Sequence, residues 1–402
     1  MPSPESYRSI LPSDVSAKMV AIRRDLHRHP ELAGHEVRTA AAVMAELQAL
    51  GLNPRRVAGT GVVADLPGLS AGPLVALRAD MDALPIHEET GLPFASETPG
   101  LMHACGHDGH TSMLLGAARL LSQGPPPPVG VRFLFQPAEE KATGALAMIE
   151  AGALADVGLI FGGHIDRRYR TGELVLNAGP MNACADLFTI TIQGQGGHGA
   201  RPHEAVDAVV VGSLLVASLQ AIVARETDPA DPCVVTIGSF HAGSAANVIA
   251  GTAVLTGTLR AQTQATRRHL QDAIERMAAA IGQMHRASLT VTYECGTPPL
   301  VNSPEMAALA HAAAADVVGA AQVVGLRTAN MGGEDFAYFL DHVPGGFIRF
   351  GAQTDGETPF PAHSSRFDFN EAALDVGAAW FARIAILAGA SLTAGGMFPS
   401  ET

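Results

Sequence analysis

The chain has 402 residues and a net charge of −13, from 26 lysines and arginines against 39 aspartates and glutamates. Its length exceeds what one ordinary hydrophobic core holds, so two domains are expected. The acidic balance argues against nucleic acid or an anionic membrane as a main partner, because both require basic patches.

Neither an export signal nor a membrane span is expected. Residues Met1–Asp14 are polar and lack the charged-then-apolar layout of a signal peptide. The long apolar segment Ala205–Ala224 contains Asp207 and ends at Arg225, which favours a buried helix over a transmembrane helix. We therefore expect a cytoplasmic protein whose cysteines are reduced and available for packing or metal binding. The cysteines are Cys105, Cys184, Cys233 and Cys295.

The first part of the chain alternates helical and strand patterns. Amphipathic helices are predicted at Ser16–Arg28 and Glu36–Leu50. Short, mostly apolar strands are predicted at Leu74–Ala79, Val131–Phe135 and Val157–Gly162. Strands that are apolar on both faces and separated by helices indicate an α/β domain with a mostly parallel sheet, covered by helices on both faces.

The pattern changes near residue 186. Leu187–Gln193 alternates apolar and polar residues, as expected for a strand with one wet face. The following elements are predicted as helix Glu204–Glu226, strands Cys233–Phe240 and Thr252–Arg260, helix Thr263–Met284 and strand Ser288–Glu294. This order is β-α-β-β-α-β, a ferredoxin-like sandwich. We predict a catalytic domain of residues 1–185 and 296–402, ending in the helix Asn370–Leu387, with residues 186–295 inserted into it.

Two short patches carry the chemistry. Cys105 and His107 are separated by Gly106, and in a tight turn such residues can face the same side. A helix predicted at 108–121 would anchor this loop. Thiolate and imidazole ligands favour zinc-like ions, and carboxylates also admit manganese or cobalt. The second patch, Glu139 and Glu140, follows the strand that ends at residue 135, so one carboxylate could bind metal while the other holds a proton.

Two further histidines could complete a pocket for two divalent cations. His164 follows an apolar strand, and His363 follows a loop that contains glycine and proline. Of the 16 histidines most are expected to be surface or capping residues, and we assign His27, His29 and His110 to that class. Four separate segments that each place a ligand type at the end of a strand or loop nevertheless favour a metal-activated hydrolase.

The motifs resemble the aminoacylase, hippurate hydrolase and indole-acetyl-amino-acid hydrolase family of co-catalytic metallohydrolases. The resemblance runs nearly from end to end. Its motifs are RDLHRHPE (24–31), ADMDALP (79–85), HACGHDGHT (103–111), FQPAEE (135–140), GGH (196–198), GEDF (333–336) and HSSRF (363–367). The resemblance implies that the inserted sandwich is a lid and dimerisation domain.

The resemblance also implies roles for individual residues. One or two divalent ions (zinc, manganese or cobalt) would be held by Cys105, His107, Glu140, His164 and His363. Glu139 would be the general acid/base, and Asp82 would orient the site from outside the ligand shell. Other branches of the wider family have a histidine ligand at the position of Asp80, a duty that Cys105 takes over here.

The implied reaction is hydrolysis of N-acyl amino acids to a carboxylic acid and a free amino acid by a metal-activated hydroxide. His198 would donate to the oxyanion, across a homodimer or higher oligomer formed through the inserted domain. Asn247 and Arg260 would bind the substrate carboxylate, for which the planar guanidinium of arginine is suited.

Three alternatives remain open at this point. A metallo-dipeptidase or carboxypeptidase would act on the same amide and carboxylate. A nicotinamide-dependent oxidoreductase is suggested by Gly194–Gly199, which fits G-x-G-x-x-G, but the preceding strand alternates and no acidic residue ends a second strand. A non-catalytic metal-binding protein would have lost its base, whereas Glu139 is present.

The chain departs from the family pattern at two places. Relatives usually follow this histidine with an apolar residue and a nearby proline, whereas here His164 is followed by Ile165, Asp166, Arg167 and Arg168, and Lys141 stands where a small residue is common. Either these charges alter the acyl or amino-acid pocket in favour of acidic substrates, or the two arginines are solvated on a loop.

Overall fold

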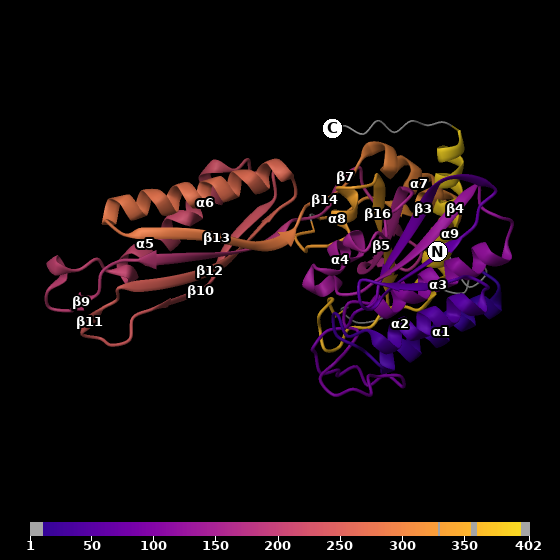
Figure 1. The fold of residues 1–402 in the computed structure, drawn as a ribbon, viewed down its shortest axis with the longest axis horizontal. Helices are drawn as coiled ribbons and strands as arrows, with labels where there is room; N and C mark the ends of the chain where they lie inside the picture. Colours follow the sequence, from indigo (N-terminus) through magenta and orange to yellow (C-terminus); the bar gives the residue numbers. More distant parts are fainter. Residues whose placement is uncertain (1–10, 329, 355–359, 395–402) are drawn as a thin grey trace. The chain divides into compact units, whose positions relative to one another are not determined.

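The computed structural model describes residues 11–328, 330–354 and 360–394, except for the side chain of Cys295. The chain divides into two compact units (Figure 1). The first unit comprises Met1–Gly179, Asn302–Arg327 and Tyr338–Thr402, and the second comprises Pro180–Val301 and Thr328–Ala337. The strands at their boundaries are β7 (Gly179–Asn182) and β14 (Leu300–Asn302).

The first unit is built on an eight-stranded sheet with the order β1-β2-β4-β3-β5-β16-β6-β15. The strands are β1 (Arg55–Val57), β2 (Gly61–Leu66), β4 (Val129–Gln136), β3 (Ser70–Asp80), β5 (Val157–Arg170), β16 (Gly345–Gln353), β6 (Leu174–Val175) and β15 (Val323–Val324). The four central strands β4, β3, β5 and β16 are parallel, and β1, β2 and β6 add antiparallel pairings. The prediction of a mostly parallel sheet is therefore confirmed.

Helices enclose this sheet. They are α1 (Ser13–Arg28), α2 (Val37–Ala49), α3 (His107–Gln123), α4 (Gly144–Glu150), α7 (Pro304–Val318), α8 (Ala337–Leu340) and α9 (Ala372–Thr393). Every residue of β4 is buried, as are all but the last of β16, so both faces of the central sheet are covered. Helices α3 and α9 pack against each other and against β3, and the fully buried Trp380 of α9 contacts Phe161 of β5 and Phe350 of β16.

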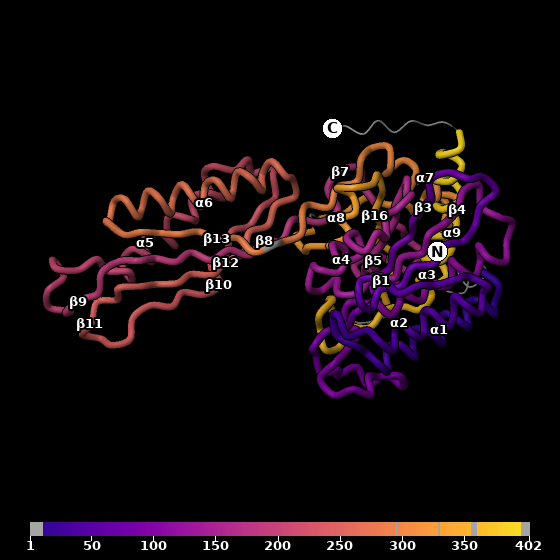
Figure 2. Tube along the Cα trace, viewed as in Figure 1, coloured from indigo at the N-terminus to yellow at the C-terminus, as the bar shows by residue number. Residues whose placement is uncertain are grey.

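The second unit is an antiparallel sheet of order β10-β12-β8-β13 with two helices. Its elements are β8 (Ala185–Gln193), α5 (Ala208–Ala221), β10 (Cys233–Ala242), β12 (Thr252–Ala261), α6 (Gln264–His285) and β13 (Ser288–Thr297). Figure 2 follows the chain through them in the order β-α-β-β-α-β. Helix α5 begins later than predicted because the Asp207 carboxylate caps it by accepting from the backbone N–H of Val209 (2.9 Å).

A second pair of strands in this unit, β9 (Gly197–His198) and β11 (Val248–Ile249), lies beyond the end of the main sheet (Figure 1). The glycines of 194–199 therefore lead from an antiparallel strand into a short antiparallel pair of strands. A dinucleotide-binding loop instead joins a buried parallel strand to a helix, so the oxidoreductase alternative lacks its structural context.

Two helical segments have the length and apolar composition of a membrane span, Ala208–Glu226 and Ala372–Thr393. Half of the second window is buried inside the protein, as is one third of the first. Helix α9 is a core helix of the first unit, with Trp380 and Phe381 fully enclosed. These compositions are therefore weak evidence for a membrane.

Candidate metal centre

The predicted ligands of the first unit come together where its parallel strands end. Strand β3 ends at Asp80, two residues before Asp82, and β4 ends at Gln136, just before Glu139 and Glu140. His164 differs from its prediction, because β5 continues to Arg170 and His164 lies within the strand. It still projects at the same edge, since the pairing of β5 with β3 stops at Gly162.

His107 is held with one nitrogen free. It is the first residue of α3, and the preceding Gly106 has φ 93°, a left-handed conformation that favours glycine. Its Nδ1 donates to the backbone oxygen of Asp82 (2.9 Å) and lies 3.2 Å from Asp82 Oδ1. Because a carbonyl oxygen only accepts, Nδ1 carries the proton, and in the neutral ring Nε2 presents a lone pair. This Nε2 is buried and has no hydrogen-bond partner.

Asp82 connects this histidine to the Glu139–Lys141 turn. Its carboxylate accepts the backbone N–H of Glu139 (3.2 Å) and of Glu140 (3.0 Å). The turn is a single 3₁₀ turn, flanked on both sides by alanines with positive φ. The buried Asp82 carboxylate thus fixes His107 and the turn relative to each other.

The two glutamates reach the same point. Glu139 Oε2 lies 3.9 Å from His107 Nε2, and Glu140 Oε1 lies 4.0 Å from it. Glu140 Oε1 also lies 3.3 Å from His363 Nε2. The hydrogen bond with Glu140 raises the pKa of His363 above its ordinary value.

Cys105 and His164 form the other side of the cluster, with Cys105 Sγ 3.3 Å from His164 Nε2. His164 Nδ1 donates to the backbone oxygen of Ile165 (2.7 Å), so its Nε2 also presents a lone pair. Burial lowers the pKa of His164 well below the usual value, which keeps the ring neutral. Burial raises the pKa of the Cys105 thiol well above its ordinary value, a direction that a bound cation would reverse.

These residues fit a divalent cation. The donor atoms of Cys105, His107 and His164 lie within 4.8 Å of one another, as do those of Cys105, Glu140 and His363. His107 Nε2 is buried and makes no hydrogen bond. An unsatisfied buried polar atom costs ~1–3 kcal/mol, a penalty that a coordinated cation removes. The mixture of sulfur, nitrogen and oxygen donors suits zinc, cobalt or manganese.

His110 is a residue of this region that the sequence interpretation missed. It is fully buried rather than a surface residue. Its Nδ1 lies 2.6 Å from Asp80 Oδ1, and its Nε2 accepts the backbone N–H of Ile165 (2.8 Å). Both ring nitrogens are occupied, so His110 supports the backbone beside His164 instead of binding metal. Its position three residues after His107 on α3 is the signal that could have found it.

The expectation that His27 is a surface or capping residue is also wrong. It is fully buried, and its ring nitrogens contact Asp108 (2.8 Å) and Glu88 (3.3 Å). His29, by contrast, is partly exposed and donates to the backbone oxygen of Asp25 four residues earlier (2.8 Å), as a local capping residue does.

The remaining predicted residues, His198, Asn247 and Arg260, lie in the second unit. His198 and Asn247 are close together, because the backbone N–H of Gly199 donates to the Asn247 oxygen (2.8 Å). Arg260 lies near the other end of β12, eight residues after Thr252, which corresponds to roughly 26 Å along a strand. The three side chains of one chain are therefore not a single cluster.

The structure also shows where the residues that depart from the family pattern lie. Lys141 is exposed at the end of its turn. Asp166, Arg167 and Arg168 lie in β5, not on a loop, and Arg168 forms an ion pair with Asp166 (2.6 Å). Arg167 is 8% exposed and is not solvated as one alternative expected.

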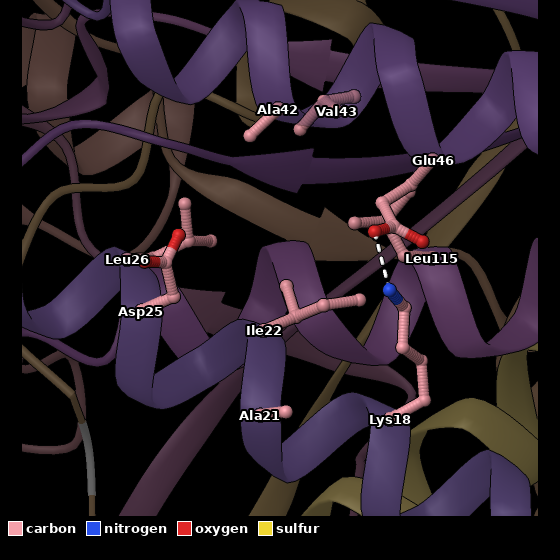
Figure 3. Close-up of a pocket in the computed structure, with 9 residues that line it drawn as sticks. All are labelled: Lys18, Ala21, Ile22, Asp25, Leu26, Ala42, Val43, Glu46 and Leu115. Carbon is pink, nitrogen blue, oxygen red and sulfur yellow. Dashed lines mark ion pairs between the residues drawn. The ribbon is translucent and has the colours of Figure 1, made fainter.

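A groove elsewhere in the first unit lacks these features. It has a volume of about 190 Å³, lies between α1 and α2, and is crossed by the Lys18–Glu46 ion pair of 2.6 Å (Figure 3). It is lined by Lys18, Ala21, Ile22, Asp25, Leu26, Ala42, Val43, Glu46 and Leu115. With no histidine or cysteine, this groove offers no comparable ligand set.

A cluster of imidazoles, a thiol and carboxylates at the end of a parallel sheet is the arrangement of a metallohydrolase. Residues 76–386 match the peptidase family M20/M25/M40, and the chain belongs to this family. It is a metal-dependent amidohydrolase or metallopeptidase in class.

Two known relatives and one solved structure are similar to this chain over most of its length. The chain is 39% identical to the N-acetyl-L-cysteine deacetylase of Bacillus subtilis, over 90% of this chain and 86% of that protein. It is 40% identical to the IAA-amino acid hydrolase ILR1-like 2 of Arabidopsis thaliana, over 92% and 84%. The crystal structure of the Bacillus subtilis YXEP protein, described as a dinuclear metal binding peptidase from the M20 family, is similar with a TM-score of 0.84 and 33% identity, over 95% of this chain and 100% of that one.

Proposed function

We propose that this enzyme hydrolyses the amide bond of N-acyl amino acids and releases a carboxylic acid and a free amino acid. The observation that carries the proposal is the buried Nε2 of His107, which has no hydrogen-bond partner and lies 3.9 Å from the Glu139 carboxylate. A ligand atom for a cation and a proton acceptor thus stand side by side. The relatives named as a deacetylase and as an amino-acid-conjugate hydrolase supply the substrate class.

In this proposal Cys105 contributes to both cation positions, His107 and His164 complete one, and Glu140 and His363 complete the other. When bound, a divalent cation supplies Lewis acidity that polarises a carbonyl and lowers the pKa of water from ~15.7 toward about 7. The donors admit zinc, manganese or cobalt.

Glu139 moves the proton. Its carboxylate takes the proton of the attacking water and returns it to the amide nitrogen, which cannot leave as an anion. Asp82 keeps Glu139 in place, because it accepts the backbone N–H of that residue. Asp82 also accepts the backbone N–H of Glu140, so it fixes the position of this proposed ligand relative to the proposed base Glu139.

The second unit would supply the substrate contacts. His198 Nδ1 accepts the backbone N–H of Ala200 (3.0 Å), so its Nε2 carries a proton and can donate to an oxyanion. Arg260 would bind the substrate carboxylate, together with Asn247. Since Arg260 is far along β12 from the other two, we propose that His198 of the partner subunit completes the site.

This arrangement requires a homodimer or a higher oligomer, formed through a second unit that serves as a lid and dimerisation domain. The surface that favours it combines the edge strand β10 with α5, which pack against each other. Val209, Val210 and Leu214 of α5 are 41%, 48% and 42% exposed, and Val234 of β10 is 39% exposed. Pairing of two such surfaces would cover both an open strand edge and an apolar stripe.

The testing experiment measures amine release from a panel of N-acyl amino acids and dipeptides, with Zn²⁺, Mn²⁺ or Co²⁺ and with a chelator control. Metal-dependent release from N-acyl amino acids supports the proposal. A preference for dipeptides would favour a second candidate, a metallo-dipeptidase, which the peptidase description of the YXEP protein suggests. Absence of release with every metal would contradict both.

A further inference from the structure

Arg167 is unusual among the buried arginines of the first unit. In the described part of the chain five arginines are buried: Arg23, Arg78, Arg132, Arg167 and Arg349. Four of them form an ion pair with a carboxylate, whereas Arg167 forms none with any carboxylate of residues 11–328, 330–354 and 360–394. Burial lowers the pKa of Arg167 and the charge of Asp368 opposes this only in part, so hydrogen bonds contribute to the stabilisation of the buried guanidinium.

Those hydrogen bonds all reach the segment that leads to His363. Arg167 Nη2 donates to Thr354 Oγ1 (2.6 Å), and Nη1 donates to the backbone oxygen of Phe360 (3.1 Å). Thr354 follows the end of β16, and Phe360 lies three residues before His363. The guanidinium thus connects Thr354 to the backbone of Phe360.

The other face of the guanidinium leads toward the ligand loop. Its carbon lies 5.8 Å from the centroid of the Phe367 ring. A Cβ built on Gly106, between Cys105 and His107, would lie 3.6 Å from the same ring. Arg167 is therefore one aromatic ring away from the loop that carries two proposed ligands.

His363 is a partly exposed residue in an uncommon backbone conformation. Its side chain is 53% exposed, and its backbone is left-handed with φ 68°, which is uncommon for a residue with a side chain. One backbone bond, from its N–H to the Ala104 oxygen (2.8 Å), ties it to the ligand loop. The position of its ring therefore depends on its hydrogen bond with Glu140 and on how the adjoining segment is anchored, at Phe360 by Arg167 and at Ser365 by Glu89.

We propose that Arg167 is a positioning residue, which holds the segment carrying His363 and thereby sets the affinity of the cation that His363 would bind. The inference rests on the proposed function, because it assumes that His363 is a ligand. A planar fork with donors at two ends suits this task, since one guanidinium can bind Thr354 and Phe360 together.

Arg168 provides a matched control. It is the next residue of β5 and has the same charge, but its side chain is 49% exposed and pairs with Asp166. Replacing either arginine by methionine removes one positive charge and keeps a long side chain. Only the Arg167→Met change removes the two hydrogen bonds to Thr354 and Phe360.

The experiment titrates the full, metal-free chain with Zn²⁺ alone by calorimetry, in wild type and in the variants R167M, R168M, H363A and R167M/H363A. We expect R167M to weaken one of two binding events by roughly tenfold to a hundredfold, as supporting groups of metal ligands do, and R168M to leave both unchanged. We expect R167M to have no further effect in the H363A background, because Arg167 would act through His363.

Three results overturn the inference. R167M could bind both cations as tightly as wild type, or its loss could add fully to that of H363A. It could also keep its cation affinity but lose activity on acidic N-acyl amino acids, which would make Arg167 a direct substrate contact. If R167M does not fold, R167K replaces it. A larger loss of Zn²⁺ affinity in R167K than in R168M then supports the inference, and an equal loss overturns it. A wild-type chain that binds no divalent cation would refute the proposed function as well, whereas an unaffected R167M refutes this inference alone.

Discussion

Replacement of Asp82 by asparagine tests the link between the support of the ligands and their affinity for metal. The Asp82 carboxylate accepts two backbone N–H groups, of Glu139 (3.2 Å) and Glu140 (3.0 Å), and lies 3.2 Å from His107 Nδ1. Asparagine has the same shape, but one of its terminal groups is an N–H donor. Whichever way the amide turns, at least one of these donors then faces another donor.

The magnitude follows from these contacts. A hydrogen bond to a charged group contributes about 1.5–3 kcal/mol, and the substitution removes the charge from every bond and breaks at least one of them. A total near 3 kcal/mol corresponds to roughly a hundredfold in an equilibrium constant. We therefore expect Asp82→Asn to weaken cation affinity by about tenfold to a hundredfold. The loss is limited because His107 keeps its hydrogen bond to the backbone oxygen of residue 82.

Competition for Zn²⁺ between metal-free protein and a chromophoric chelator measures this affinity. Asp65→Asn is the matched control, because Asp65 pairs with Arg132 (2.7 Å) at β2 and does not contact the cluster. Asp82→Asn should weaken Zn²⁺ binding while Asp65→Asn should not. Equal affinities for wild type and Asp82→Asn would refute the argument that this carboxylate positions the ligands.

Three further predictions follow from the same structure. Glu139→Gln should retain its metal but lose roughly a hundredfold or more in kcat, and a fully active variant would exclude Glu139 as the base. If His198 acts across a dimer, a mixture of the weak variants Glu139→Gln and His198→Ala should regain about a quarter of wild-type activity after subunit exchange, because half of the dimers are mixed and each has one complete site. No regain would place His198 in its own chain's site. Burial opposes protonation of His27, but hydrogen bonds to Asp108 and Glu88 outweigh it and raise its pKa to about 9. Its contribution to the free energy of unfolding should be full below about pH 6.5 and lost as the pH rises through about 9. Urea unfolding of wild type and His27→Gln should therefore differ less at high pH, and a constant difference would contradict the assignment.

Local patterns predicted much of the fold. The apolar runs of β3 and β4 marked buried parallel strands, and the alternation of β8 marked a strand with one exposed face. The end of β5 was not predictable in this way, because the run from Asp166 to Arg170 is mostly polar. Those residues stay in the strand because they pair with β16 and because Asp166 forms ion pairs with Arg168 (2.6 Å) and Arg349 (3.7 Å). The pairing with β16 and the ion pair with Arg349 depend on a segment far away in the sequence.

The candidate ligands could be proposed from their residue types, because few side chains bind zinc-like ions and four segments carried them. The residues that support them could not. His110 was assigned to the surface or capping class because most of the 16 histidines were expected there, and its position one turn after His107 on α3 was not used. Arg167 was expected on a loop, whereas it is buried and bound to a segment almost 200 positions away in the sequence.

The supporting residues use ordinary chemistry in a specific place, and this explains why sequence patterns miss them. Asp82 accepts backbone N–H groups, as a helix cap does, and His110 accepts one from Ile165. Neither contact needs an unusual residue type, and each acquires its role only when the ends of separate strands meet. The ligand set therefore identifies the class of enzyme, while the geometry on which its affinity for metal depends is visible only in the folded chain.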